Sequence, residues 1–176
     1  NLAKAVGIKS GIRPDIIDAT AGLGRDSFIL ASMGSHITLI ERSQIMHDLL
    51  ADGMSKASRE GGKLSEIIAR MTLIHGDAIE ILPQTSTDVI YIDPMHPPRQ
   101  KSALVKTEMR QIRAIVGEDL DQLQLIKTAL GANCRRVALK WPAKSPLPDG
   151  LPECSHQLVG KSVRFDIFMN ANLDET

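Results

Sequence analysis

The chain has 176 residues, of which 43% are hydrophobic, and its 21 basic and 21 acidic residues give a net charge of zero. This length predicts one domain, spanning residues 1–176, with a substantial core. The charge balance argues against a non-specific nucleic-acid binder, and no apolar run reaches the roughly 20 residues that a membrane span needs.

Cysteine usage and the N-terminus indicate the cellular setting. Cys134 and Cys154 form no CxxC pair, and no histidine–cysteine cluster has zinc spacing. We therefore expect a cytoplasmic protein without a metal, whose thiols serve packing. No secretory segment opens the chain, and residue 1 is Asn and not Met, so we expect residues to be missing before it.

The first predicted strand, Ile16–Asp18, leads into a glycine turn and then an apolar helical segment. Gly22 and Gly24 allow a tight turn and a close approach to a ligand, because they lack a Cβ. A second apolar run ends in Glu41, the usual position of an acidic partner for ribose hydroxyls. Together these features predict a cofactor with an adenosine-like part.

The residues after the turn distinguish between cofactors. Dinucleotide folds place a third small residue, usually glycine, where this chain has Ser27. The neighbouring Asp26 would repel a pyrophosphate but tolerate a cationic or zwitterionic ligand. The turn therefore favours S-adenosylmethionine over NAD or FAD, although a plain tight turn of an α/β fold has the same appearance.

Strand and helix patterns alternate along the rest of the chain. The pattern predicts strands at 36–41, 71–75, 88–92, 136–140 and 163–169, helices at 44–58, 102–116 and 120–130, a turn and short helix within 59–70, and a proline-rich loop at 142–152. Residues 155–170 read as an antiparallel hairpin that turns at Gly160 and Lys161. We therefore predict a doubly wound, mostly parallel, seven-stranded Rossmann-like α/β sheet with ligands at the carboxyl ends of its strands.

Asp77 follows the third strand and precedes a short helical pattern at 78–82. Its carboxylate can accept a hydrogen bond from an adenine amino group. It can equally cap the helix, because Asp is a favoured N-cap residue. The two roles are compatible.

The sharpest signal follows the fourth strand, where Asp93 and Pro94 begin a proline-rich loop. Proline lacks an N–H and stiffens the loop, which leaves carbonyl groups free to accept hydrogen bonds. The Asp93 carboxylate and the Pro94 carbonyl could hold the two protons of an exocyclic amine and direct its lone pair at an electrophilic methyl group. The alternative is a stiff loop in which Asp93 is a turn residue.

The order Asp18, Gly22-x-Gly24, Glu41, Asp77 and Asp93-Pro94 resembles the class I S-adenosylmethionine-dependent methyltransferases. Residues 18–26 (DATAGLGRD), 91–95 (YIDPM), 100–106 (QKSALVK), 108–110 (EMR) and 160–166 (GKSVRFD) are similar to the RsmJ family of bacterial small-subunit ribosomal RNA guanine-N2 methyltransferases.

This resemblance implies N2 methylation of a guanine in 16S ribosomal RNA, either naked or within the assembled small subunit. It also implies an N-terminal region that this chain lacks. The cofactor residues that it implies are Arg25, Asp26, Glu41, Arg42, Asp77, Ala78 and Asp93.

One position departs from the pattern of amine methyltransferases, which carry an aromatic residue shortly after the motif proline to stack on the target base. This chain has His96 there. A neutral imidazole can stack on a base, but a solvent-facing loop histidine is an equal alternative.

Basic residues follow the motif and suggest an RNA-binding surface. Lys106, Arg110 and Arg113 form one stripe of the predicted helix, next to an apolar stripe. Arg99 and Lys101 precede that helix. A solvated helix face is the alternative. The other candidates for this surface are Lys140, Lys144, Lys161 and Arg164. Trp141 could stack on a base or cover the sheet edge, and we favour the packing role.

Three other functions stay open at this stage. The amine-holding chemistry also suits a DNA or protein-amide N-methyltransferase. A nicotinamide-dependent oxidoreductase would use a related fold, although Asp26 and the missing third glycine disfavour it. The last alternative is an RNA-binding protein that binds the cofactor without catalysis.

Overall fold

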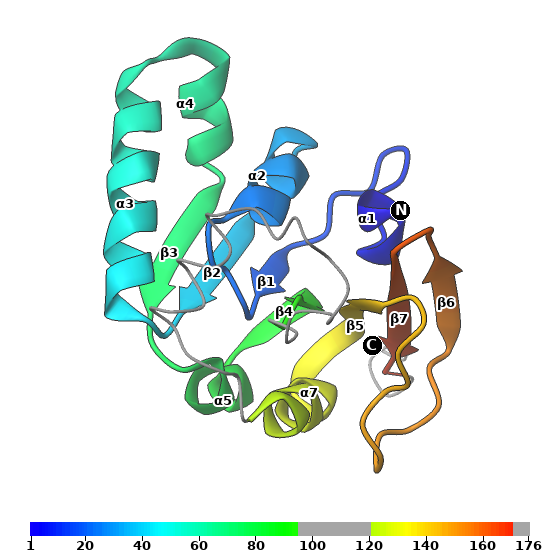
Figure 1. Ribbon diagram of the computed structural model, residues 1–176. Coiled ribbons are helices and arrows are strands. Elements are labelled where there is room, and N and C mark those ends of the chain that lie inside the picture. Colours follow the sequence, from blue (N-terminus) through cyan, green and yellow to red (C-terminus); the bar gives the residue numbers. More distant parts are fainter. Residues whose placement is uncertain (95–120, 171–176) are drawn as a thin grey trace.

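The computed structural model describes residues 1–94 and 121–170, which form alternating helices and strands (Figure 1). In chain order the elements are α1 (Leu2–Ala5), β1 (Ile16–Asp18), α2 (Arg25–Ser32), β2 (Ile37–Glu41), α3 (Gln44–Arg59), α4 (Gly62–Ile68), β3 (Met71–His75), α5 (Ala78–Ile81), the 3-10 helix η1 (Leu82–Gln84), β4 (Ser86–Ile92), α7 (Gln122–Gly131), β5 (Asn133–Pro142), β6 (His156–Val159) and β7 (Val163–Met169).

The strands form one seven-stranded sheet in the order β3-β2-β1-β4-β5-β7-β6. Strands β1 to β5 are parallel, whereas β7 pairs antiparallel with both β5 and β6. The predicted fold class, including the C-terminal hairpin, is therefore confirmed. The strand order reverses between β1 and β4, and such a switch point is where doubly wound sheets bind ligands.

The bounds of the strands match the predictions closely in β1, β3 and β7 and extend beyond them in β4 and β5. Strand β4 starts two residues early because Ser86 and Thr87 pair with Asn133 and Cys134 of β5. Strand β5 continues to Pro142 because β7 pairs with it on the other side, up to Pro142↔Val163. Cross-strand pairing of this kind leaves no mark in the local hydrophobic pattern.

Helices cover both faces of the sheet and bury two apolar cores (Figure 1). One core packs α1 to α4 against the sheet through residues such as Leu30, Leu39 and Tyr91. The other packs α5, η1 and α7 against the opposite face through Leu82, Ile126 and Leu139. Burial on both faces explains why the strands lack a clean alternation of polar and apolar residues.

The predicted helices in the described part of the chain are present. Helix α3 begins after Ser43, whose hydroxyl oxygen accepts a hydrogen bond from the Met46 N–H at 3.4 Å, so the predicted N-cap is confirmed. Helix α4 follows Gly61, as the predicted turn and short helix require. The predicted helix at 102–116 lies outside the described residues. None of the helices described is long and apolar enough to cross a membrane.

Candidate active site

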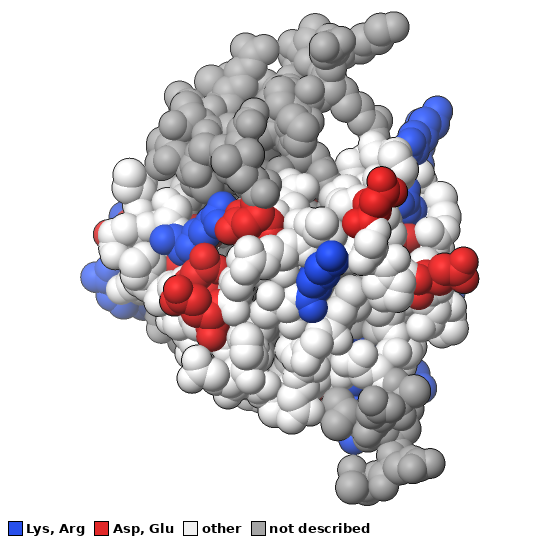
Figure 2. Space-filling view, turned by 90° about the horizontal axis from the view of Figure 1, so that it is seen from below, with Lys and Arg blue, Asp and Glu red and all other residues white. Residues whose placement is uncertain are grey.

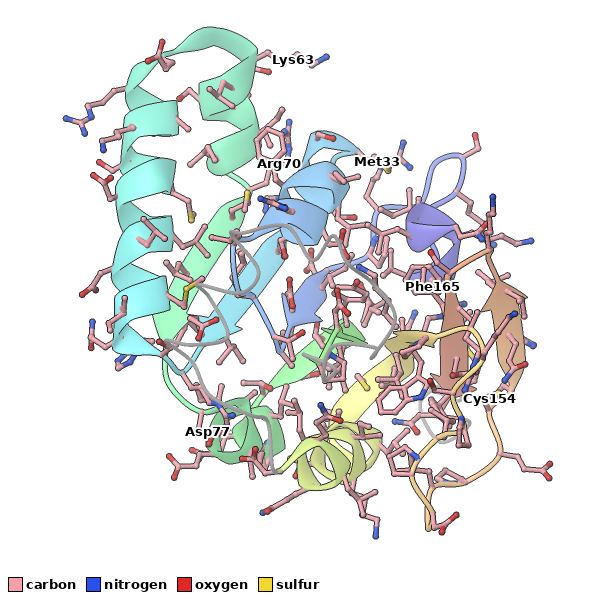
Figure 3. All side chains as sticks on the ribbon, viewed as in Figure 1. Met33, Lys63, Arg70, Asp77, Cys154 and Phe165 are labelled. Atoms are coloured by element: carbon pink, nitrogen blue, oxygen red, sulfur yellow. The ribbon has the colours of Figure 1, made fainter. Side chains whose placement is uncertain are left out.

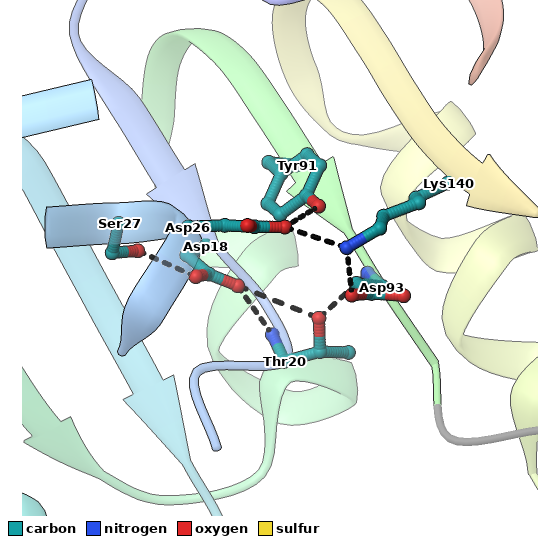
Figure 4. A network of polar contacts seen from close by, with 7 residues as sticks. All are labelled: Asp18, Thr20, Asp26, Ser27, Tyr91, Asp93 and Lys140. Carbon is teal, nitrogen blue, oxygen red and sulfur yellow. Dashed lines mark hydrogen bonds and ion pairs between the residues drawn. The ribbon is translucent and has the colours of Figure 1, made fainter. Parts of the chain in front are cut away.

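A polar cavity of about 280 Å³ opens at the carboxyl ends of β1 and β4, where the strand order reverses. Four charged side chains from four elements meet there: Asp18 of β1, Asp26 of α2, Asp93 after β4 and Lys140 of β5 (Figure 4). Gly22 of the glycine turn and Arg25 at the start of α2 form another part of the wall. Residues that are distant in sequence but predicted at strand ends therefore do come together.

Asp18 is almost fully buried, with 2% of its surface exposed. One carboxylate oxygen accepts a hydrogen bond from the Ser27 hydroxyl at 2.5 Å, and the other accepts one from the Thr20 N–H at 3.0 Å. Burial raises the pKa of Asp18 to about 6, although both hydrogen bonds oppose the rise. Asp18 therefore ties the first turn of α2 to the loop after β1.

Asp26 lies in the first turn of α2, where a carboxylate interacts favourably with the helix dipole. Its Oδ2 atom accepts hydrogen bonds from the Tyr91 hydroxyl at 2.5 Å and from Lys140 Nζ at 2.8 Å. Tyr91 has 1% of its surface exposed, and burial, together with the nearby carboxylates, raises the pKa of its hydroxyl. The tyrosine therefore stays protonated and acts as a donor to Asp26.

Asp93 directly follows β4, and two hydrogen bonds hold it in place. Its backbone N–H donates to the Thr20 hydroxyl oxygen at 2.7 Å, and its Oδ2 atom lies 2.7 Å from Lys140 Nζ. Burial raises the pKa of the Asp93 carboxyl, and the adjacent Lys140 ammonium opposes that rise. Pro94, which follows, is buried. The predicted motif thus borders the same cavity as Asp18 and Gly22.

Glu41 lies at the end of β2, as predicted, and is buried. Its two carboxylate oxygens accept hydrogen bonds from the backbone N–H groups of Gly22 at 2.9 Å and Ser43 at 2.8 Å. The side chain therefore braces the glycine turn against the start of α3. A contact between Glu41 and a ribose stays a prediction beside this structural role.

The two glycines of the turn have different surroundings. Gly22, at φ +52°, lines the polar cavity, and a Cβ there would meet only the Thr20 carbonyl oxygen at 3.8 Å. Gly24, at φ +66°, faces the core, and its Cβ would lie 3.0 Å from a methyl group of Leu50. The structure thus gives Gly24 a packing role, and its contact with a cofactor stays a prediction.

Asp77, Ala78 and Arg42, which follow β3 and β2, line a smaller cavity of about 50 Å³ together with Thr20 and the start of α7. The Asp77 carboxylate accepts a hydrogen bond from the Ile79 N–H at 2.8 Å and so caps α5, where Figure 3 shows it. The predicted capping role is confirmed, and its second oxygen has no partner among the described residues. Arg42 forms an ion pair with Asp121 at 2.9 Å.

These surroundings fit the chemistry of S-adenosylmethionine. Carboxylates at the polar cavity suit the cationic sulfonium and ammonium groups, and the cavity near Asp77 offers acceptor atoms for an adenine amino group. Within residues 1–94 and 121–170, no group of three or more histidine, cysteine, aspartate or glutamate side chains could hold a metal ion.

The predicted RNA-binding residues need a correction. Lys140 lies in the cavity wall, where Asp26 and Asp93 bind its ammonium group, so this group is not available for an RNA phosphate. Arg164 is buried and bonds to Asp166 and to three backbone carbonyl groups, so it is not an RNA contact either. The other predicted contacts after the motif lie outside the described residues, as does His96; they are Arg99, Lys101, Lys106, Arg110 and Arg113.

The face seen from below in Figure 2 shows basic and acidic side chains interspersed, without a continuous basic patch in the described part of the surface. Trp141 is buried, and its indole N–H donates to the Pro146 carbonyl at 3.0 Å, so its predicted packing role is confirmed.

Sequence reasoning missed four polar members of the site: Thr20, Ser27, Tyr91 and Lys140. Some of these residues are far in sequence from their polar partners; Lys140 and Asp26, for example, are 114 residues apart. One signal could have found Lys140: it follows an apolar strand run in the same way as Asp18 and Asp93 do. Tyr91 stands within the apolar run of β4, so its role as a donor had no such signal.

Comparison with known proteins places the chain in a family. The family model described as "Putative SAM-dependent methyltransferase" matches residues 1–170. Ribosomal RNA small subunit methyltransferase J of Brucella anthropi is 55% identical over 98% of this chain and 84% of its own length. The protein of the same name from Agrobacterium fabrum is 52% identical over 96% of this chain and 81% of its own length.

Solved structures agree with this assignment. The SAM-dependent methyltransferase of Neisseria gonorrhoeae has a TM-score of 0.77 at 34% identity, over 98% of this chain and 67% of that one. The glycopeptide N-methyltransferase MtfA with bound S-adenosylmethionine has a TM-score of 0.53 at 15% identity, over 96% of this chain and 66% of that one, and supports the fold alone. The chain therefore belongs to the ribosomal RNA small subunit methyltransferase J family of SAM-dependent methyltransferases.

Proposed function

We propose that this protein transfers a methyl group from S-adenosylmethionine to the exocyclic N2 amine of a guanine in 16S ribosomal RNA of the small subunit. The names of its relatives support the RNA substrate. The observation that carries the amine chemistry is the position of Asp93 and Pro94 at the end of β4, beside the polar cavity. With such a substrate, the enzyme would act in the cytoplasm of a bacterium.

The cofactor would supply an electrophilic methyl group on its sulfonium. Acidic and glycine residues at the ends of β1 and β4 would surround its methionine part, whereas the ends of β2 and β3 would hold the ribose and adenine. The residues for the methionine part are Asp18, Gly22, Gly24, Arg25, Asp26 and Asp93, and those for the adenosine part are Glu41, Arg42, Asp77 and Ala78.

Asp93 has one carboxylate oxygen available for the target amine. Its Oδ2 atom is bound by Lys140, and its Oδ1 atom has no hydrogen-bond partner within the described part of the chain. Oδ1 and the Pro94 carbonyl would accept the two N–H groups of the amine, which makes its nitrogen more pyramidal and frees its lone pair. The negative charge also stabilises the ammonium that develops on the nitrogen.

Recognition of the RNA rests on residues outside the described part of the chain. His96 would stack on the target base. Phosphate groups would pair with the basic residues near the motif, namely Arg99, Lys101, Lys106, Arg110 and Arg113. A base within a duplex would have to flip out to reach Asp93.

The test is transfer of labelled methyl groups from S-adenosylmethionine to small ribosomal subunits, free 16S RNA, DNA and protein. We expect label in RNA and, after digestion, N2-methylguanosine. Asp93→Ala should lower kcat at least about a hundredfold and leave RNA binding intact. Asp149→Ala, which removes an exposed carboxylate in a loop, is the matched control.

Each of these measurements has an outcome that would contradict the proposal. Label on another base position would exclude guanine-N2 chemistry, and label in DNA or protein would favour the other N-methyltransferases. Calorimetry that detects binding of NAD but not of S-adenosylmethionine would favour an oxidoreductase. Near-normal turnover by Asp93→Ala would exclude the proposed mechanism. A wild-type protein that binds cofactor and RNA but transfers no methyl group would instead support the alternative of a non-catalytic RNA-binding protein.

A further inference from the structure

Lys140 is the one basic side chain from β5 that reaches into the described cavity, and it bridges two carboxylates that come from opposite sides of the site. Its Nζ atom lies 2.8 Å from Asp26 Oδ2 and 2.7 Å from Asp93 Oδ2 (Figure 4). Only 22% of the lysine side chain is exposed, so water screens these charge-assisted hydrogen bonds incompletely.

The bridge restricts how Asp93 can act. Thr20 holds the Asp93 backbone N–H, and Lys140 holds Oδ2, so the main chain and one carboxylate oxygen are each held by a hydrogen bond. Oδ1 is then the carboxylate oxygen left to accept a hydrogen bond. We propose that Lys140 is a positioning residue for methyl transfer, which orients Asp93 and keeps it ionised so that Oδ1 accepts the target amine. This inference rests on the proposed function.

The charges in the cavity give a second reason why Asp93 needs a lysine beside it. The groups that face Asp93 are Asp18 from β1, Asp26 from α2, Tyr91 from β4 and Lys140 from β5, and Arg25 also lines the cavity. Without the lysine, three carboxylates would share the site with Arg25. Mutual repulsion would then favour a protonated Asp93, and a protonated oxygen donates a hydrogen bond where the amine needs an acceptor.

The strand that carries Lys140 does not depend on this side chain. Backbone pairing with β7 (Lys140↔Phe165) and of the preceding residue with β4 (Leu139↔Ile92) holds the strand in place. The ammonium group contacts the cavity and not the apolar cores. A lysine substitution should therefore affect the chemistry of the site without unfolding the protein.

The test compares Lys140→Met, Lys140→Arg and the control Lys127→Met, which alters an exposed lysine on α7. We expect Lys140→Met to lower kcat roughly 10- to 100-fold with little change in the KM for RNA. The acid limb of its kcat–pH profile should move to higher pH, because loss of the ammonium raises the pKa of Asp93. Lys140→Arg should return that limb toward its wild-type position, and Lys127→Met should match wild type.

An NMR titration of the aspartate carboxyl carbons, with Asp93→Asn to assign the Asp93 signal, gives a readout independent of methyl transfer. We expect the pKa of Asp93 to be higher in Lys140→Met than in wild type. An unchanged Asp93 titration, or wild-type kcat in Lys140→Met, would overturn the role of Lys140. A wild-type protein that transfers no methyl group to RNA would instead refute the proposed function, and the titration would still decide whether Lys140 keeps Asp93 ionised.

Discussion

Thr20 connects Asp93 to Asp18 through a single hydroxyl group. Its oxygen accepts the Asp93 N–H at 2.7 Å, and the same hydroxyl contacts the buried Asp18 carboxylate at 3.4 Å. Thr20→Val keeps the shape of the side chain and leaves the Asp93 N–H without its acceptor. We expect a loss of about 1–2 kcal/mol in the free energy of unfolding, measured with urea, and a fall in kcat of roughly tenfold.

Thr20→Ser retains the hydroxyl and is the matched control for this substitution. It should keep most of the stability and the turnover of the wild-type protein. Equal losses in the valine and serine variants would mean that the threonine methyl group matters and that the hydroxyl bridge to Asp93 does not.

Among the elements, the glycine turn between β1 and α2 combines a ligand-facing residue with a core-facing one. Gly22→Ala adds a methyl group near the polar cavity and should cost about 1 kcal/mol of stability, the penalty for a positive φ. Gly24→Ala adds the same backbone strain and also contacts Leu50 at 3.0 Å, so we expect roughly 1–3 kcal/mol more. Thermal unfolding of both variants measures the difference, and equal losses would contradict the packing role of Gly24.

Elements with a strong local pattern could be predicted from the sequence, and so could the site residues at strand ends. The hydrophobic runs gave β1, β3 and β7 their bounds, and Asp18, Asp77 and Asp93 stand where parallel strands finish. Contacts between distant elements could not be predicted. Lys140 looks like a surface lysine in the sequence, but its partner Asp26 lies 114 residues away, and only the folded sheet brings the two together in the cavity wall. Arg164 pairs with Asp166, two residues along β7, whereas the backbone carbonyl groups that also bind it belong to residues 142, 143 and 145.

At the scale of the whole molecule, Asp18 couples stability to pH. Its folded-state pKa is about 6, above the ordinary value of 3.8, so the folded protein binds more protons than the unfolded chain between these values. This contribution to stability is therefore present at low pH and is lost as the pH rises toward 6. The buried carboxylate should lower the free energy of unfolding by about 2 kcal/mol between roughly pH 4.5 and pH 7.

Asp18→Asn removes the titrating group and isolates this effect. We expect the stability of wild type relative to Asp18→Asn, from urea unfolding at each pH, to fall as the pH rises from about 4.5 to 7. Asp149→Asn makes the same change of charge at an exposed position and should show no such trend relative to wild type. A stability difference between wild type and Asp18→Asn that stays constant, or grows with pH, would mean that the Ser27 and Thr20 hydrogen bonds to Asp18 outweigh its burial.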